Sequence, residues 1–103
     1  MRQGFKLRPK ALADVRQIWD SLAEKGGVTA ADRLLEHFYD ACRMLADLPG
    51  IGHTRTDLTD RAMLFWTVGD YHVIYHPEVI PLEVERIFYA GRDIKRELSQ
   101  NPA

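Results

Sequence analysis

The spacing of apolar residues changes twice along the chain, and the first change comes at Pro9. Before it, residues 4–8 alternate between apolar and charged positions, which predicts a short half-buried strand. After it, apolar residues recur at intervals of three and four. This predicts an amphipathic helix that begins near Pro9 and ends at Gly26–Gly27. Its apolar stripe consists of Leu12, Val15, Ile18, Trp19 and Leu22, and Asp14 is assigned to the polar face.

A second helical stripe follows after a turn of only a few residues. We expect Thr29 to cap this helix and Pro49–Gly50 to end it. Because the connection is so short, the two helices are predicted to lie antiparallel as a hairpin. The second stripe consists of Leu34, Leu35, Phe38, Cys42, Leu45 and Leu48.

The rest of the chain has the alternating pattern of β-strands. A polar stretch over 52–60 is interpreted as a loop, and Gly69–Asp70 and residues 77–81 as turns. A short helix is expected to start at Asp93 and to fray at Asn101–Pro102. The three predicted strands span 62–68, 71–76 and 82–90.

These elements predict a single α+β domain over residues 1–103. The last three strands are expected to form a small antiparallel sheet, which the N-terminal strand joins. The helical hairpin must cover one face of this sheet, because its two apolar stripes have no other surface to pack on. The other face is expected to be open or partly open.

Composition and charge narrow the function classes. The 103 residues are 46% hydrophobic and 28% charged, which is typical of a soluble globular domain. A net charge of −1 argues against nucleic-acid binding through a global positive field, which leaves a local basic face as the alternative. No direct sequence-specific nucleic-acid binding is expected. The single cysteine, Cys42, excludes an internal disulfide. We expect a cytoplasmic protein with no membrane segment, metal or cofactor.

Several short segments occur in a distinctive order: a strand with a proline and a helix start, a Leu-Pro-Gly-Ile-Gly segment before the sheet, and an arginine-rich last strand. In that order they resemble the ParE/RelE family of bacterial type II toxins, most of all its ParE-like members. The segments are Leu7–Ala11 with Asp14–Val15 and Ile18–Trp19; Leu48–Gly52 with Arg55, Asp57–Leu58 and Arg61; Tyr71 with Val73–Tyr75; and Arg86–Asp93.

The resemblance implies a toxin that a cognate ParD-like antitoxin neutralises in a toxin–antitoxin hetero-oligomer. ParE-like members inhibit DNA gyrase, whereas RelE-like members cleave mRNA on the ribosome. A third possibility is a non-toxic member that only binds its antitoxin. Fold alone does not choose among these functions.

The residues available for proton transfer favour gyrase inhibition over RNA cleavage. RNA cleavage requires a base, an acid and positive charge around the phosphate. RelE-like members supply much of this with lysines and arginines, but this chain has no lysine between Lys25 and Lys95. The protein is therefore predicted to inhibit an enzyme rather than to be one. An endonuclease would depend on His53, His72, His76, Arg61, Arg86 and Tyr89.

Four arginines are the candidates for binding the target or the antitoxin: Arg55, Arg61, Arg86 and Arg92. For Arg86 a structural ion pair is an equal alternative, for example with Asp57, Asp70 or Asp93, because arginine is rarely buried without a partner. Tyr89 stands where many ParE-like members have histidine, and its ring is expected to pack at the sheet edge.

A basic cluster surrounds the first predicted strand. It either attracts an acidic antitoxin tail or keeps the strand edge solvated. The cluster consists of Arg2, Lys6, Arg8 and Lys10.

Overall fold

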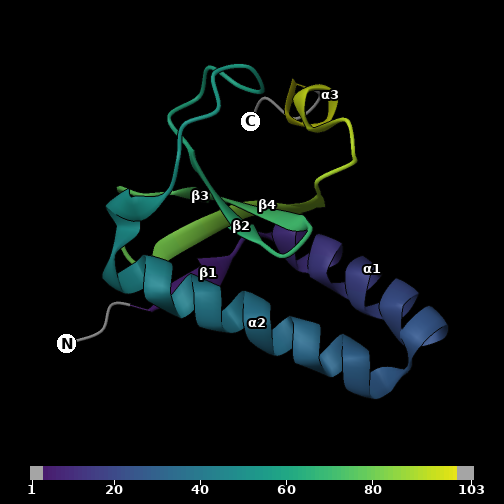
Figure 1. The fold of residues 1–103 in the computed structure, drawn as a ribbon. Coiled ribbons are helices and arrows are strands. Elements are labelled where there is room, and N and C mark those ends of the chain that lie inside the picture. The colour runs from purple at the N-terminus through teal and green to yellow at the C-terminus, as the bar shows by residue number, and fades with distance from the viewer. Residues whose placement is uncertain (1–3, 100–103) are drawn as a thin grey trace.

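A four-stranded sheet lies between a helical hairpin and a short C-terminal helix in the computed structural model, which describes residues 4–99 (Figure 1). The predicted α+β class and the order of elements are confirmed. The elements are β1 (Phe5–Leu7), α1 (Pro9–Gly26), α2 (Val28–Asp47), η1 (Pro49–Ile51), β2 (Leu64–Val68), β3 (Tyr71–His76), β4 (Leu82–Tyr89) and α3 (Ile94–Ser99). The predicted fraying at Asn101–Pro102 lies outside the described residues.

The strand order in the sheet is β1-β4-β3-β2. The meander of β2, β3 and β4 is antiparallel, as predicted, but β1 pairs with β4 in parallel. The sheet is therefore mixed rather than purely antiparallel. β1 covers only Leu82–Val84 of β4, so the second half of β4 has no neighbouring strand on that side.

A bulge in β4 decides which side chains face the helices. Ile74 pairs with Arg86 and the next residue, Tyr75, pairs with Val84, so Glu85 is the extra residue. Val84 and Ile87 are three positions apart and would face opposite sides of the sheet in a regular strand. Because of the bulge, both pack in the core under the helices.

The hairpin turns on a single residue, Gly27, whose φ is +93°. Its amide donates to the carbonyl of Ala23 and its carbonyl accepts from the amide of Ala31, so it belongs to the ends of both helices. The prediction that Thr29 caps the second helix is wrong. That helix already begins at Val28 and has no side-chain cap.

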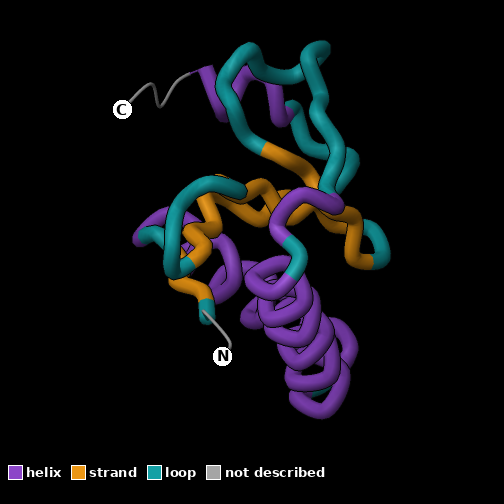
Figure 2. The backbone as a smooth tube through the Cα atoms, turned by 90° about the vertical axis from the view of Figure 1, so that its left-hand side faces the viewer, coloured by secondary structure: helices purple, strands orange, loops and turns teal. Residues whose placement is uncertain are grey.

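The sheet has a hydrophobic core on each face. The larger core lies against α1 and α2 and includes Phe38, Leu45 and Tyr75. The smaller core lies on the other face, where α3 and the segment before β2 cover part of the sheet (Figure 2). That face, predicted to be open or partly open, is thus partly closed. Its buried members are Met63, Phe65, Ile74, Phe88, Ile94 and Leu98.

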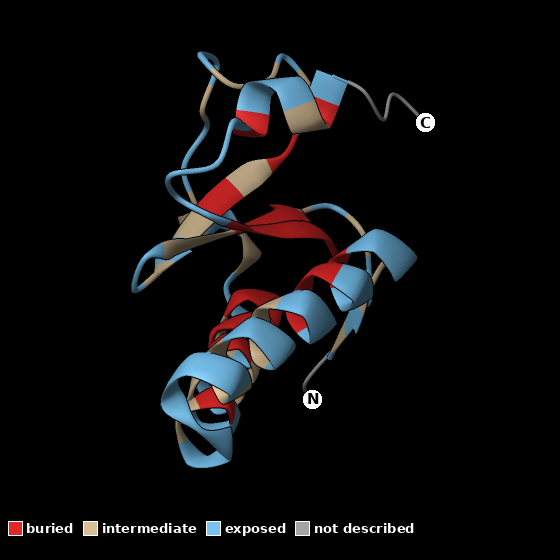
Figure 3. Ribbon diagram, turned by 90° about the vertical axis from the view of Figure 1, so that its right-hand side faces the viewer, coloured by how far each residue is buried: buried red, intermediate tan, exposed pale blue. Residues whose placement is uncertain are grey.

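Burial follows the predicted helix stripes, with three exceptions. The inner helix faces and the centre of the sheet are buried, and the outer helix faces are exposed (Figure 3). Leu12 and Leu48, predicted in the stripes, are 37% and 55% exposed, whereas Asp14, assigned to the polar face, is buried. Within residues 4–99, no helix combines the length and the apolar character that crossing a membrane requires.

Candidate functional site

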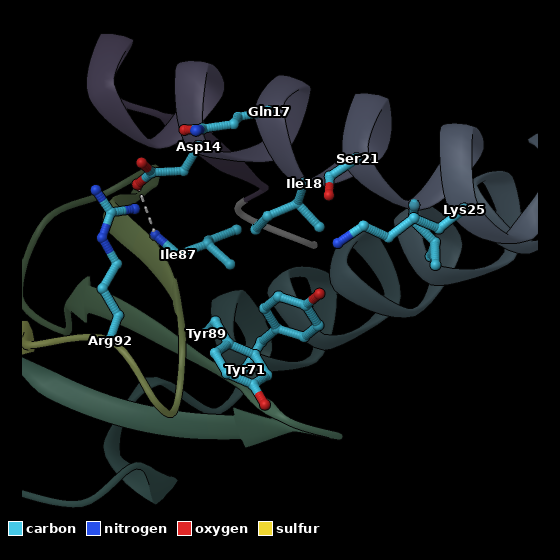
Figure 4. Close-up of a pocket in the computed structure, with 10 residues that line it drawn as sticks. Asp14, Gln17, Ile18, Ser21, Lys25, Tyr71, Ile87, Tyr89 and Arg92 are labelled. Atoms are coloured by element: carbon cyan, nitrogen blue, oxygen red, sulfur yellow. Dashed lines mark hydrogen bonds between the residues drawn. The ribbon is translucent and has the colours of Figure 1, made fainter.

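A groove of about 420 Å³ runs between α1 and the end of the β3–β4 pair (Figure 4). We call it the α1–β4 groove. It lies where the second half of β4 has no neighbouring strand, so α1 alone forms the opposite wall. Its lining residues are Asp14, Gln17, Ile18, Ser21, Leu22, Lys25, Tyr71, Ile87, Tyr89 and Arg92.

Two tyrosines form the sheet side of the groove. The rings of Tyr71 and Tyr89 meet edge to face with centroids 5.8 Å apart, and Tyr71 contacts the Phe38 ring in the same way at 5.3 Å. Burial raises the pKa of Tyr71, so its hydroxyl stays protonated and can donate a hydrogen bond. Tyr89 is 54% exposed, so much of its ring is available to a partner.

A buried ion pair closes one end of the groove. Arg86 donates to both carboxylate oxygens of Asp14, from Nε at 2.7 Å and from Nη2 at 2.9 Å. The same carboxylate accepts the backbone amide of Ile87 at 3.1 Å, in the position where a neighbouring strand would supply an acceptor. Of the two alternatives for Arg86, the structure has the ion pair, but its partner is Asp14 and not Asp57, Asp70 or Asp93.

Cations lie at both ends of the groove. Arg92 donates to Glu97 from Nε at 3.1 Å and from Nη2 at 2.8 Å, and its guanidinium lies 5.2 Å from the centre of the Phe88 ring. These contacts fix the Arg92 side chain beside the groove, where it is 41% exposed. Lys25 lies toward the opposite end (Figure 4) and has no ion-pair partner within residues 4–99.

A second charged cluster surrounds the bulge residue Glu85. Its carboxylate lies 2.8 Å from Arg8 Nη1, 2.7 Å from His76 Nε2 and 3.6 Å from Arg61 Nη2. Burial acts to raise the pKa of Glu85, but the hydrogen bond with His76 and the charges of Arg61 and Arg8 outweigh it and lower the pKa. Arg8 also donates to Glu83 at 2.8 Å. This cluster ties β1, β3, β4 and the loop before β2 together.

The members of the predicted basic cluster at the first strand have different surroundings. Arg8 is held by two carboxylates, and Lys6 and Lys10 are exposed. Arg2 lies outside the described residues.

The three candidate histidines have different neighbours. His53 pairs with Phe65 through its backbone and stacks on Trp66 with centroids 6.2 Å apart. His72 packs against the Phe65 ring, and burial together with the charge of Arg55 lowers its pKa. His76 contacts Glu85.

The candidate arginines and Tyr89 are also dispersed. Arg55 forms an exposed pair with Asp57, Arg61 shares Glu85 with His76, and Arg86 is buried against Asp14. Tyr89 lies in the α1–β4 groove. Of the six residues named for RNA cleavage, the structure therefore brings only Arg61 and His76 to a common charged partner, Glu85. Among residues 4–99, no cluster of three or more histidine, cysteine or acidic side chains could hold a metal ion.

The α1 side of the groove was largely missed by reasoning from sequence. Of the six lining residues that α1 supplies, only Ile18 and Leu22 were placed in the apolar stripe. One signal was present for Asp14. Counting Ala11 as part of the stripe gives the positions 11, 14, 15 and 18, a helical repeat that places Asp14 on the buried side.

Comparisons with known proteins agree with this fold. Residues 5–94 match the family model described as the ParE toxin of the type II toxin–antitoxin system parDE. No curated protein sequence matches the chain. Among solved structures, a chain of the chromosomal ParDE toxin–antitoxin system from P. aeruginosa superposes with a TM-score of 0.72 at 17% identity. The match covers 85% of this chain and 96% of that one.

Proposed function

Because the chain belongs to the ParE toxin family of type II toxin–antitoxin systems, we propose that it inhibits DNA gyrase in the cytoplasm until a cognate antitoxin neutralises it. On this proposal the protein is not itself an enzyme. It acts by binding, and the antitoxin suppresses toxicity by forming a hetero-oligomer with it.

The dispersal of the candidate proton carriers is the observation that supports gyrase inhibition over RNA cleavage. Cleavage requires a base and an acid near one phosphate. Arg86 forms the buried ion pair with Asp14, and Tyr89 lies in the α1–β4 groove. His76 and Arg61 both contact the carboxylate of Glu85, which Arg8 contacts as well. The chain therefore offers a surface for partners rather than a convergent reaction centre.

The test is to induce the chain alone in a bacterial host and to follow DNA synthesis and protein synthesis by pulse labelling. We expect DNA synthesis to fall first and co-expression of the adjacent antitoxin gene to restore it. The purified chain should also inhibit supercoiling by purified gyrase. An earlier fall in protein synthesis would identify an RNA-cleaving member, and growth without any fall would identify a member that only binds its antitoxin.

A further inference from the structure

We propose that Glu85 is an internal anion that keeps the phosphates of RNA away from the basic cluster around the β4 bulge. Its carboxylate occupies the place that a phosphate would otherwise take between Arg8, Arg61 and His76. This inference rests on the proposed function, because it accounts for a toxin that carries a local basic cluster and yet acts on gyrase rather than on RNA.

Three side chains converge on one oxygen of Glu85. Oε1 accepts from Arg8 Nη1 at 2.8 Å and contacts His76 Nε2 at 2.7 Å, and Arg61 Nη2 lies 3.6 Å away. An ionised carboxylate can only accept hydrogen bonds, so Nε2 of His76 carries the proton. The three side chains come from the residue after β1, the end of β3 and the loop before β2. They therefore surround the carboxylate from three separate parts of the chain.

The same donors suit a phosphate. A guanidinium group matches carboxylates and phosphates with one planar arrangement of donors. The carboxylate of Glu85 does not use all of these donors, because Nη1 of Arg61 is buried without a hydrogen-bond partner among residues 4–99. A phosphate has further acceptor oxygens and would satisfy more of the donors than the single oxygen that they now share.

The donors of the cluster are partly open to solvent, whereas its carboxylate is not. The side chains of Arg8, Arg61 and His76 are 37%, 28% and 18% exposed, and that of Glu85 is 8% exposed. Glu85 is the extra residue of the β4 bulge, and its carboxylate meets side chains from the ends of both neighbouring strands. An external anion would have to take the place of this carboxylate to reach all three donors.

The charge of the cluster depends on Glu85. Lys6 lies opposite Glu83 in the β1–β4 register, and Arg8 donates to Glu83 at 2.8 Å. The cations Lys6, Arg8 and Arg61 therefore face the two carboxylates of Glu83 and Glu85. Without the charge of Glu85, only Glu83 would oppose them. The result would be a local positive potential on a chain whose net charge is −1, and such a potential attracts phosphates.

Glu85 thereby determines specificity by repelling one class of partner. A protein discriminates between partners as much by excluding one as by attracting another. A phosphate that approaches the donors meets the like charge of Glu85, and displacing this side chain would leave a buried anion without its cations. The unaltered cluster is therefore satisfied from within and has little affinity for RNA.

The first experiment measures whether removing the carboxylate creates an anion site. Thermal unfolding is followed in inorganic phosphate and in chloride at matched ionic strength. We expect phosphate to raise the Tm of Glu85→Ala by about 5 °C more than that of the unaltered chain, because the anion binds only the folded state. Glu36→Gln is the control. It removes a negative charge from an exposed position of α2 and should respond like the unaltered chain.

The second experiment measures binding of a short single-stranded RNA by fluorescence anisotropy. Glu85→Ala should bind at least tenfold more tightly than the unaltered chain, and Glu36→Gln within twofold of it. Glu85→Gln keeps the size of the side chain without its charge. It should gain less affinity, because its amide still fills the place of the phosphate. Circular dichroism confirms that each variant is folded, and Glu85→Gln decides the question if Glu85→Ala is not.

The outcomes separate the inference from the function on which it rests. Equal affinity for RNA in the unaltered chain and in the folded Glu85 variants would overturn the inference, as would an equal response of their Tm to phosphate. Failure of the proposed function appears in a different assay, in which the unaltered chain would not inhibit supercoiling by purified gyrase. That result would overturn the gyrase proposal whether or not the Glu85 variants gain affinity for RNA.

Discussion

At the scale of single residues, the carboxylate of Asp14 serves both the charge of Arg86 and the backbone of β4. It accepts two guanidinium donors and the amide of Ile87, and both side chains are buried, with 6% and 7% exposure. Removing one partner of a buried pair leaves the other charge without compensation.

We therefore expect Asp14→Ala to lower the free energy of unfolding by about 3–5 kcal/mol, measured by urea denaturation. Asp57→Ala is the control, because it breaks the exposed pair with Arg55, which solvent screens, and its effect on stability should be much smaller. Equal losses in the two variants would mean that burial of the Asp14–Arg86 pair has no energetic consequence.

His72 gives stability a dependence on pH. Burial, with a contribution from Arg55, lowers its pKa in the folded state below the unfolded value of about 6.5. The unfolded chain then binds the proton more readily. The stability that neutral His72 contributes is therefore fully present above the unfolded pKa. It is lost as the pH falls through the lower pKa of the folded state.

Replacing His72 by phenylalanine should therefore flatten the decline in stability between pH 7.5 and pH 5. The measurement is urea denaturation at each pH, and the exposed His37→Gln variant controls for the loss of a histidine elsewhere. A decline as steep as that of the unaltered chain would show that His72 does not couple folding to pH.

Only part of this residue-level picture could be predicted from sequence. Arg86 stood out because an arginine between apolar strand residues needs a partner, and a partner was found. The identity of that partner depends on how α1 crosses the unpaired half of β4. The pattern along a single helix does not contain this tertiary relation.

At the scale of elements, the helical hairpin depends on the backbone of Gly27. With φ of +93° and ψ of 162°, this residue lies in a region that side chains rarely adopt. The sequence predicted the turn from its two adjacent glycines but placed the cap on Thr29. A glycine in this conformation supplies the helix start without a side-chain cap, so the N-cap is Gly27 and the helix begins two residues earlier than predicted.

We expect Gly27→Ala to lower stability by about 1–3 kcal/mol, because alanine is strained at this φ. Gly26→Ala is the matched control. Gly26 is helical, and an added Cβ would meet Leu22 and Ala30 at ordinary contact distances of 3.5 and 3.7 Å, so its cost should be small. Thermal unfolding of both variants distinguishes them, and similar shifts in Tm would contradict the assignment of strain to Gly27.

At the scale of the whole molecule, the two faces of the sheet carry cores of unequal extent. The hairpin covers one face along two long helices, whereas α3 covers part of the other with Ile94 and Leu98. The first layer was predictable, because two amphipathic stripes require a common surface. The second was not, since a six-residue helix with two apolar side chains gives a weak periodic signal.

The difference in size between the two cores predicts that α3 opens separately from the sheet and the hairpin. In native-state hydrogen exchange, we expect the amides of α3 to exchange by local opening at a lower free energy than those of β3, which exchange only on global unfolding. Leu98→Ala should widen the gap by speeding exchange in α3 more than in β3. Equal protection in both elements would mean that the molecule unfolds as one cooperative unit.

The parallel pairing of β1 with β4 has a consequence for the toxin while it is being synthesised. Arg8, which follows β1, and its partner Glu85 are separated by 77 positions in the chain. The first strand emerges from the ribosome long before the strand beside which it lies, and the hairpin emerges before the sheet that it covers. The nascent toxin therefore cannot complete its sheet or form the α1–β4 groove until β4 has been released.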